Sequence, residues 1–501
     1  MQNDVRSTPR RGGVRVVVLV TLIVVFVAGL FGLSQQKLVG QPNIILISLD
    51  TVRADRLGLY GAQRSPTPNL DRFAEEAVVF DNAYAVIGET MFSHASLFTS
   101  RYPSELSTMD YRFSLPPDVP NLPQVLGLYG YETSAVTAGG HLSDLFGFEQ
   151  GFDHFESPRH WASFYDVLPP TMQWLDSRAG SDPFFLLLHS YDAHARYMKP
   201  SPYGFAFANP EYRGTGFFIA ERNAGVTRTL EGRFFPKTGL PELLDWDEPR
   251  LLGPANKARL ALRANDPDEE SRRVTRHDVD FVRGVYDGAL FYADMMFGVT
   301  MAELDRRGLL ENSIIIVLSD HGEELGERGL FNHRFSLNDA VLKVPLLVRM
   351  PEGAHGGRRI SEWVSLLDIM PTLLEVVGAE LPAGTRGKSF VAALEGGSIE
   401  GHEALFSENV FRMMSIKHRR GRLTFSGVGG DSPFAADLLA SARIDGPAFE
   451  LDEGLDASSA ELLRAELEAW RRALPSSPRT QREVSDELRS VLQEQGYWGP
   501  M

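Results

Sequence analysis

The chain has 501 residues, with 66 acidic and 50 basic side chains, and its formal net charge at pH 7 is −16. This length suits two or three domains, and the acidic balance argues against a general nucleic-acid binder, which needs a basic surface. Hydrophobic residues make up 43% and charged residues 23%, which is an ordinary globular composition. Because the chain has no cysteine, disulfides, thiolate metal sites and thiol nucleophiles are excluded.

Residues 16–33, VVVLVTLIVVFVAGLFGL, form an uncharged apolar run, and the preceding tail of residues 1–15 contains four arginines before it. A run of this length just crosses a bilayer, and a basic tail favours the cytoplasmic side. We therefore expect a single-pass inner or plasma membrane protein whose catalytic domain lies on the extracytoplasmic side. A cleaved signal peptide is the competing interpretation, although no clear A-x-A cleavage site follows the run.

Beyond the anchor, short apolar runs alternate with helical patterns. The runs are typical of strands buried on both faces of a sheet, and they lie at 43–50, 133–139, 184–190, 313–320 and 345–350. Helical spacing is found in Leu70 to Val78, in 285–306 and in 366–377. This alternation predicts an α/β fold in which a large mixed sheet is flanked by helices, over residues 43–395.

Two further regions depart from this pattern. Residues 200–280 have little periodicity and include the charge run DPDEESRR, so we interpret them as an insertion or lid, with a solvated surface loop as the alternative. Residues 396–501 predict a smaller α+β subdomain. It has a hairpin at 413–427 that turns near Gly421, a helix at 458–474 and a short terminal helix.

Acidic side chains follow two of the predicted strands. Asp50 ends the run at 43–50, and Asp320 and His321 end the run at 313–320. In open α/β sheets ligands lie beyond the carboxyl ends of the strands, so both acids should reach one crevice. Carboxylates with an imidazole form a site that Zn²⁺ or Mn²⁺ accepts. Either Asp alone is more often a helix cap or a turn residue.

Seven motifs occur along the chain in the order seen in the sulfatase branch of the alkaline phosphatase superfamily, which the chain resembles over residues 43–375. They are NIILISLDTVRADRLGLYG, PTPNLDRFAEEAVVFDNAYA, SHASLFTSRYP, GYETSAV, LLLHSYDAH, SDHGEELGERGLFNH and VPLLVRMP. The resemblance implies an alkaline phosphatase/sulfatase-like fold and one catalytic divalent metal ion. Zn²⁺ or Mn²⁺ is favoured, and Ca²⁺ or Mg²⁺ is the alternative, because imidazole suits the softer cations.

Carried over position by position, the resemblance implies that Asp50, Thr90, Asp320 and His321 bind the metal and that Thr90 is the nucleophile. Strict sulfatases convert a Cys or Ser at this place into formylglycine, but oxidation of a Thr gives a ketone. A metal-activated Thr hydroxyl is the open route, and Thr occupies this place in relatives that transfer phosphoglycerol or phosphoethanolamine. A second departure is Thr51, where strict sulfatases carry another Asp.

Four histidines complete the expected site, because imidazole serves as an acid or a cation near pH 7. His194 and His333 align with positions that protonate or bind the leaving group, and we expect both to be catalytic. His94 replaces the family's Arg, and His141 aligns with a His that contacts the ester, so both are expected to bind substrate. His189 and Asp192 are expected behind these residues.

We therefore predict an enzyme that cleaves or transfers phosphate esters through Thr90. Its substrate would be an anionic ester of a glycan, a lipid or a small molecule. Two alternatives stay open: sulfate-ester hydrolysis without formylglycine, and a silent member that binds anionic glycans or lipids. The nucleophile depends on the alignment register, and Ser93 and Ser96 are the substitutes if that register is shifted.

Overall fold

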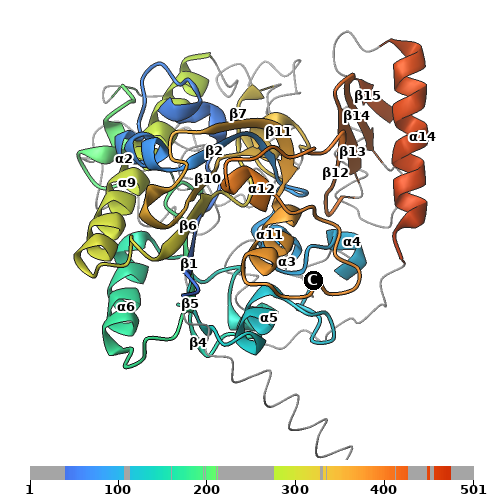
Figure 1. The fold of residues 1–501 in the computed structure, drawn as a ribbon. Coiled ribbons are helices and arrows are strands. Elements are labelled where there is room, and N and C mark those ends of the chain that lie inside the picture. The colour runs from blue at the N-terminus through green and yellow to red at the C-terminus, as the bar shows by residue number, and fades with distance from the viewer. Residues whose placement is uncertain are drawn as a thin grey trace, which may run out of the picture.

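A computed structural model describes residues 40–106, 113–158, 161–195, 197, 199–209, 212, 276–327, 331–334, 336–411, 413–426, 448–451 and 456–475. Within this part of the chain the main sheet has nine strands in the order β11-β2-β10-β6-β1-β5-β3-β4, with β9 beside β2 (Figure 1). The strands are β1 (Asn43–Leu49), β2 (Val78–Tyr84), β3 (Glu132–Val136), β4 (His154–Glu156), β5 (Phe184–Ser190), β6 (Ser313–Leu318), β9 (Lys343–Val344), β10 (Leu346–Arg349) and β11 (Arg359–Ser365).

The sheet is mixed, as predicted, and its centre is parallel. β1 pairs in parallel with both β5 and β6, whereas β10 is antiparallel to β6 and to β2. The expected strand at 345–350 thus runs against its neighbours. The physical reason is the connection: Leu346 pairs with Leu318, so the segment between β6 and β10 stays at the carboxyl edge of the sheet. A parallel strand would need a crossover to the opposite edge.

Helices cover both faces of the sheet, because successive residues of a buried strand point to opposite sides. Ile45 and Ile47 of β1 pack on one face and Ile44 and Leu46 on the other. The first face carries α2 (Pro68–Phe73), α6 (Phe164–Ser177) and α9 (Arg276–Arg306), and the second carries α3 (Thr90–Thr99), α4 (Pro103–Leu106), α5 (Leu122–Leu128), α11 (Ile369–Val376) and α12 (Val391–Leu394) (Figure 1). The core is therefore two apolar layers separated by the sheet.

The predicted helices need one correction. Helical spacing extends from Leu70 to Val78, but α2 ends at Phe73, a 3₁₀ turn covers Ala74–Glu76, and Val78 begins β2. The apolar run of β2 continues the helical spacing by coincidence, and tertiary pairing with β10 and β11 decides the outcome. The helix expected at 285–306 begins earlier, at Arg276, and that expected at 366–377 is a 3₁₀ turn followed by α11.

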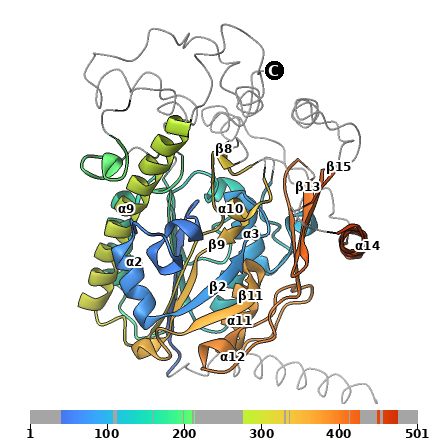
Figure 2. The ribbon, with the colours of Figure 1, turned by 90° about the horizontal axis from the view of Figure 1, so that it is seen from above.

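A second, antiparallel sheet lies beside the β11 edge of the first. Its strands are β12 (Ala404–Glu408), β13 (Met413–His418), β14 (Gly421–Ser426) and β15 (Ala448–Leu451), and α14 (Ala457–Ala473) packs on its outer side (Figures 1 and 2). The predicted hairpin is confirmed, with Gly421 paired to His418. Leu463 and Leu467 of α14 bury against Ile416 and Leu423. The expected terminal helix lies outside the described residues, and the domain boundaries stay predictions.

The prediction of a single-pass membrane protein is corrected by the structure. Among the helices in its described part, none combines the length and the apolar character that a bilayer span needs. α9 has 31 residues, but charged side chains recur along it, from Asp278 to Arg306. The predicted tail and anchor, residues 1–33, lie outside the described residues, as does most of the insertion predicted at 200–280.

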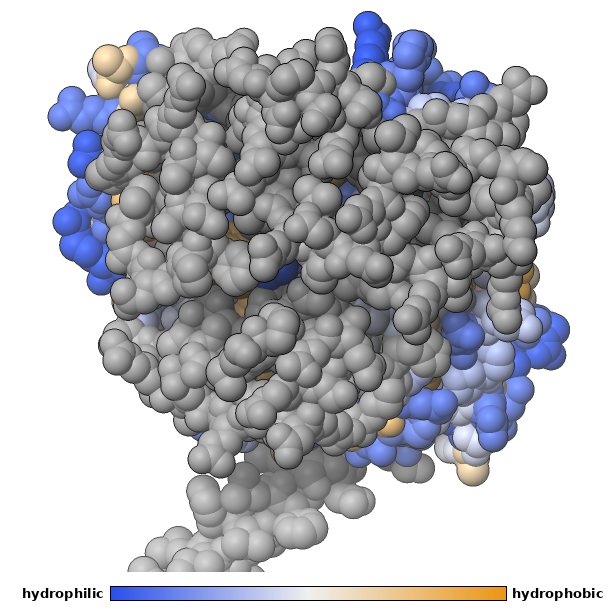
Figure 3. All heavy atoms as spheres, turned by 180° about the vertical axis from the view of Figure 1, so that it is seen from behind, coloured by the Kyte–Doolittle hydropathy of each residue, from blue (hydrophilic) through white to orange (hydrophobic). Residues whose placement is uncertain are grey.

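Few large hydrophobic side chains are exposed in the described part of the chain. Seen from behind, the side chains that are coloured by hydropathy are mostly hydrophilic (Figure 3). Large exposed hydrophobic residues in the described ranges stand apart from one another in the sequence, namely Leu128, Tyr165, Val299, Leu381 and Leu462. Scattered residues of this kind are normal on protein surfaces. They do not mark a function.

Candidate active site

The candidate site lies at the carboxyl edge of the three central strands. Asp50 follows β1, Asp320 and His321 follow β6, and His189 occupies the penultimate position of β5. In the parallel register Ser48 of β1 faces both His189 of β5 and Leu318 of β6. Because parallel strands present their carboxyl ends at one edge, the register brings these side chains together.

Asp50, Asp320 and His321 form one cluster. All three are fully buried, and one ligand atom from each lies within 4.8 Å of the others. Asp50 Oδ1 and Asp320 Oδ2 have no hydrogen-bond partner. Two fully buried carboxylates with oxygen atoms left over are costly unless a cation compensates them. The cluster therefore fits a divalent metal ion.

The orientation of His321 fits the same conclusion. Its Nδ1 lies 2.9 Å from the carbonyl oxygen of Gly322, so Nδ1–H is the donor and Nε2 carries the free lone pair. Nε2 faces the two acids, 3.5 Å from Asp320 Oδ2. Metal-binding histidines usually donate their other ring N–H to a carbonyl or carboxylate in this way. The residues present thus fit a carboxylate/imidazole site for a divalent metal ion.

The two acids carry unequal proton affinities. Burial raises the pKa of Asp50 well above its ordinary value, and the charge of Asp320 raises it further. Burial also acts on Asp320, but the adjacent His321 and His94 hold the pKa of that carboxyl below its ordinary value. Without a cation, burial and mutual repulsion thus act against ionisation of Asp50 more than against that of Asp320. A divalent ion would remove the reason for this asymmetry.

Thr51 forms a strained turn immediately after Asp50. Its φ is +59°, in the left-handed region that β-branched residues rarely adopt. The buried Tyr286 of α9 stabilises the turn, because its hydroxyl donates to the Thr51 carbonyl at 2.7 Å and accepts from Arg53 N–H at 3.0 Å. The Thr51 hydroxyl donates to the Asp50 carbonyl at 2.8 Å. Strain of this kind collects at functional sites, and here it aims Asp50 at the cluster.

Thr90 is the first residue of α3, and it lies directly on the cluster. Its hydroxyl donates to Asp50 Oδ2 at 2.9 Å, and its Oγ1 is 3.4 Å from His321 Nε2. The two alternative nucleophiles on α3, Ser93 and Ser96, do not have these contacts. The Ser93 hydroxyl donates to the Asp320 carbonyl at 2.7 Å, and the Ser96 hydroxyl is buried away from any hydrogen-bond partner. Of these three hydroxyls, only that of Thr90 contacts both Asp50 and His321.

His94 lies one turn further along α3 and is fully buried. Its Nδ1 lies 2.9 Å from the Thr90 carbonyl oxygen and must therefore donate, so Nε2 accepts from the Ser48 hydroxyl at 3.0 Å. Burial lowers the pKa of His94 to about 4, which leaves the ring neutral. Both ring nitrogens are thus occupied by protein partners. The geometry makes His94 a support for the first turn of α3, whereas the sequence predicts a contact with substrate.

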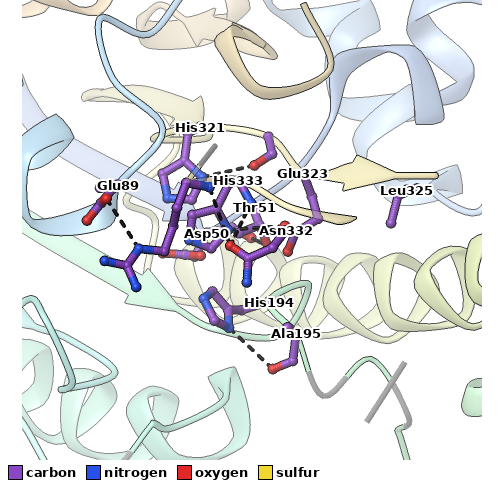
Figure 4. A network of polar contacts seen from close by, with 12 residues as sticks. Asp50, Thr51, Glu89, His194, Ala195, His321, Glu323, Leu325, Asn332 and His333 are labelled. Carbon is purple, nitrogen blue, oxygen red and sulfur yellow. Dashed lines mark hydrogen bonds and ion pairs between the residues drawn. The ribbon is translucent and has the colours of Figure 1, made fainter. Parts of the chain in front are cut away.

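Two further histidines approach the cluster from separate loops, as Figure 4 shows for His194 and His333. His333 Nδ1 lies 3.1 Å from Oε1 of Glu323, so its N–H donates to a carboxylate and Nε2 is left for the site. His194 Nδ1 lies 3.3 Å from the Ala195 carbonyl, and burial lowers the pKa of this histidine well below its ordinary value. The rings of His333 and His194 are 5.4 Å apart, and those of His333 and His321 are 4.4 Å apart.

His141 lies beside the same Trp161 ring as His194. Its backbone N–H donates to the Tyr191 hydroxyl at 3.2 Å, and burial lowers its pKa to about 3, so it is neutral. The Trp161 ring lies 4.1 Å from that of His194, 4.5 Å from that of Tyr191 and 5.9 Å from that of His141. An aromatic wall therefore borders the site on this side.

Sequence reasoning missed several residues that shape the site. Glu323 holds His333, Tyr286 holds the Thr51 turn, and Glu89 precedes the nucleophile candidate and pairs with Arg334 at 3.3 Å. His189, which the sequence places behind the site histidines, has its Nε2 3.5 Å from Asp50 Oδ2. A signal existed only for Glu323, which stands in the DHGE motif. The others are joined by the fold alone, across more than two hundred positions in the cases of Tyr286 and Arg334.

The chain is similar to known proteins in both sequence and structure. The family model described as Sulfatase matches residues 42–379. An N-acetylglucosamine-6-O-sulfatase of Bacteroides thetaiotaomicron is 26% identical over 409 residues, which are 72% of this chain and 72% of the relative. The steryl-sulfatase of Mus musculus is 28% identical over 421 residues, 73% of this chain and 67% of the relative.

Solved structures share the architecture. The phosphonate monoester hydrolase of Agrobacterium radiobacter aligns with a TM-score of 0.64 and 18% identity, over 89% of this chain and 99% of that chain. A structure in complex with D-glucosamine-2-N,6-O-disulfate aligns with a TM-score of 0.62 and 20% identity, over 86% of this chain and 98% of that chain. These likenesses confirm the predicted α/β fold with a large mixed sheet flanked by helices.

Proposed function

Because the chain belongs to the sulfatase family, we propose that it cleaves or transfers phosphate esters with Thr90 as the nucleophile, at a site that holds one divalent metal ion. The chain is an enzyme that acts on sulfate or phosphate esters. The role of Thr90 as the nucleophile is supported by the contacts of its hydroxyl, which lies 2.9 Å from Asp50 Oδ2 and 3.4 Å from His321 Nε2.

Asp50, Asp320 and His321 would hold the metal ion, with Thr90 Oγ1 beside them. Imidazole in this set favours Zn²⁺ or Mn²⁺ over Ca²⁺ or Mg²⁺. When bound, such an ion acts as a Lewis acid, which lowers the pKa of an adjacent hydroxyl and stabilises charge on the transferred group. The proton transfers of the reaction are then performed by side chains of this protein.

In the first step, the Thr90 oxygen attacks phosphorus while the bond from phosphorus to the leaving oxygen breaks. The hydroxyl proton passes to Asp50 Oδ2, the acceptor to which Thr90 already donates. Thr90 opens α3, a helix of 10 residues, so the phosphorylated side chain would stand beside free backbone N–H groups. Helix N-termini favour phosphate in this way.

The leaving oxygen needs a proton, and we assign this task to His333, assisted by His194. Glu323 accepts from the Nδ1 side of His333 and so leaves Nε2 for the site. In the second step His333 takes the proton of an incoming water or alcohol, which attacks phosphorus as the bond to the Thr90 oxygen breaks, and Asp50 Oδ2 returns its proton to that oxygen. Water makes the enzyme a hydrolase and an alcohol makes it a transferase.

Phosphate is favoured over sulfate because of the nucleophile. A formylglycine enzyme expels sulfate by re-forming a carbonyl, and Thr90 offers no such route. A sulfate ester of a glycan is the second candidate, supported by the similarity to an N-acetylglucosamine-6-O-sulfatase over 72% of this chain. In both cases the substrate is an anionic ester.

The test is intact mass spectrometry of enzyme quenched during turnover. The probes are an aryl methyl phosphate diester, an aryl phosphonate monoester and the matching aryl sulfate, each with Mn²⁺ or Zn²⁺. We expect a covalent phosphoryl adduct that maps to Thr90 and is absent from Thr90→Ala, with faster turnover of the phosphorus esters. Equal or faster turnover of the sulfate without dependence on Thr90 would contradict the proposal. A lack of turnover with every probe, despite bound metal, would favour a silent binding protein.

A further inference from the structure

The turn between β12 and β13 reaches from the second sheet to the candidate site. Asn409 at its start is 1% exposed, and its side-chain Nδ2 donates to the backbone carbonyl of Arg334 at 3.3 Å. Arg334 directly follows His333, the proposed proton donor. The guanidinium of Arg334 also lies over the ring of Phe411, two residues beyond Asn409, at 5.9 Å. The second sheet therefore contacts the segment that presents His333.

Asn409 is itself held rigidly. Its side-chain Oδ1 accepts from the backbone N–H groups of Phe411 and Met413, each at 3.0 Å. The preceding residue, Glu408, donates its N–H to the Val86 carbonyl at 2.9 Å and accepts from Ser104 N–H at 2.7 Å. The turn is thus fixed both internally and to the loop between β2 and α3. A side chain anchored in this way can hold its partner in one place.

The same segment is tied to the nucleophile from its other side. Arg334 Nε lies 3.3 Å from Oε1 of Glu89, and the side chains of this pair are only 12% and 5% exposed. Glu89 is the N-cap of α3 and immediately precedes Thr90. One continuous set of contacts thus runs from Asn409 through the His333–Arg334 segment to Glu89 and Thr90.

We propose that Asn409 is a positioning residue for the reaction: by holding the Arg334 carbonyl, it keeps His333 Nε2 within reach of the leaving oxygen. This inference rests on the proposed role of His333. The proton moves from His333 to the leaving oxygen as the bond to phosphorus breaks, and it returns from the incoming water or alcohol. A displaced His333 therefore penalises esters whose leaving groups need the proton most.

The experiment compares Asn409→Asp with the wild-type protein on aryl methyl phosphates and on the matching aryl sulfates, whose leaving phenols range from strong to weak acids. The Asp side chain keeps the oxygen that accepts from Phe411 and Met413 but loses the donor to Arg334. Asn409→Ser is the second variant, in case a carboxylate disturbs folding. Asn82→Asp is the control, because Asn82 Nδ2 also donates to a backbone carbonyl, that of Ser361, between β2 and β11.

We expect Asn409→Asp to lower kcat by about tenfold for the most weakly acidic phenol and by less than about twofold for p-nitrophenol. KM and metal content should be unchanged, and His333→Gln should show the same dependence on the leaving group more strongly. A uniform loss of kcat across the series of phenols, or a change in thermal stability alone, would show that Asn409 has only a structural role. If His333→Gln shows no dependence on the leaving group, the proposed role of His333 fails, and the inference fails with it.

Discussion

The Thr90 hydroxyl donates a hydrogen bond to Asp50 Oδ2 at 2.9 Å, although Asp50 ends a strand and Thr90 begins a helix forty positions later. A short, fully buried contact between a hydroxyl and a carboxylate is the arrangement expected where an alcohol is prepared for attack. This contact also distinguishes Thr90 from Ser93, whose hydroxyl donates to the Asp320 carbonyl instead. The choice between these hydroxyls is directly testable.

Replacement of Thr90 by Ala should reduce kcat/KM by at least about a thousandfold, because the nucleophilic oxygen is lost. Thr90→Ser should retain measurable turnover, since Ser supplies the same hydroxyl without the methyl group. Ser93→Ala is the matched control three residues along α3, and it should keep most of the activity. Steady-state kinetics with the fastest ester probe measures all three. Loss of activity in Ser93→Ala together with an active Thr90→Ala would move the nucleophile to Ser93.

Removal of the Asp320 carboxylate should prevent metal binding, because it leaves only Asp50 and His321 as charged or imidazole ligands in the cluster. The wild-type protein should contain one equivalent of Zn²⁺ or Mn²⁺ by elemental analysis, and Asp320→Asn should contain none. A metal present at about a hundred times its Kd should stabilise the wild-type fold by about 2.7 kcal/mol, and chelation should reverse this. An Asp320→Asn protein that binds metal with unchanged affinity would remove Asp320 from the ligand set.

Replacement of Tyr286 by Phe should weaken both the fold and the catalysis. The variant leaves the Thr51 carbonyl and the Arg53 N–H buried without their partner, at a cost of about 2 kcal/mol. Since the Thr51 turn aims Asp50 at the cluster, kcat should fall as well. Tyr165→Phe is the control, because that residue is 71% exposed. Urea unfolding and kinetics of both variants give the answer, and unchanged kcat in Tyr286→Phe would show that the turn keeps its shape without the hydroxyl.

The buried Glu408 should make stability depend on pH. Burial raises the pKa of Glu408 from 4.5 to about 7, and the neighbouring Glu105 adds to this. A carboxyl group whose pKa rises on folding stabilises the folded state fully below its unfolded pKa of 4.5, and this contribution is lost as the pH rises through 7. The amide of Glu408→Gln cannot ionise. The free energy of unfolding of the variant, relative to that of the wild type, should therefore increase by about 3 kcal/mol when the pH is raised from 4 to 8.

Urea unfolding at the two pH values measures this difference. Glu403→Gln, which changes an exposed residue one position before β12, is the control. If Glu408→Gln and Glu403→Gln behave alike across the pH range, the carboxyl of Glu408 does not gain its proton on folding. The junction between the two sheets would then have no titrating group at this position.

The sequence alone determined the outline of the fold and the members of the buried acid and imidazole cluster. Buried strands of eight or fewer residues can be recognised because they are apolar on both faces, and an acid directly after such a strand must lie at its carboxyl edge. Asp50, Asp320 and His321 were predicted on these grounds, and the parallel register of β1 and β6 is what joins them. The helical spacing that continued into Val78 shows the limit of the same reasoning, since periodicity does not reveal which strand a segment will pair with.

Only the tertiary structure decided which side chains support those residues. Three of these contacts join distant parts of the chain: Tyr286 with Thr51, Arg334 with Glu89, and Asn409 with Arg334. No local sequence pattern marks the residues that make them. The tautomers of His94, His321 and His333 likewise depend on which carbonyl, hydroxyl or carboxylate the fold places beside each ring. The physical reason is that hydrogen bonds act over about 3 Å in space, whereas sequence patterns report only on neighbours along the chain.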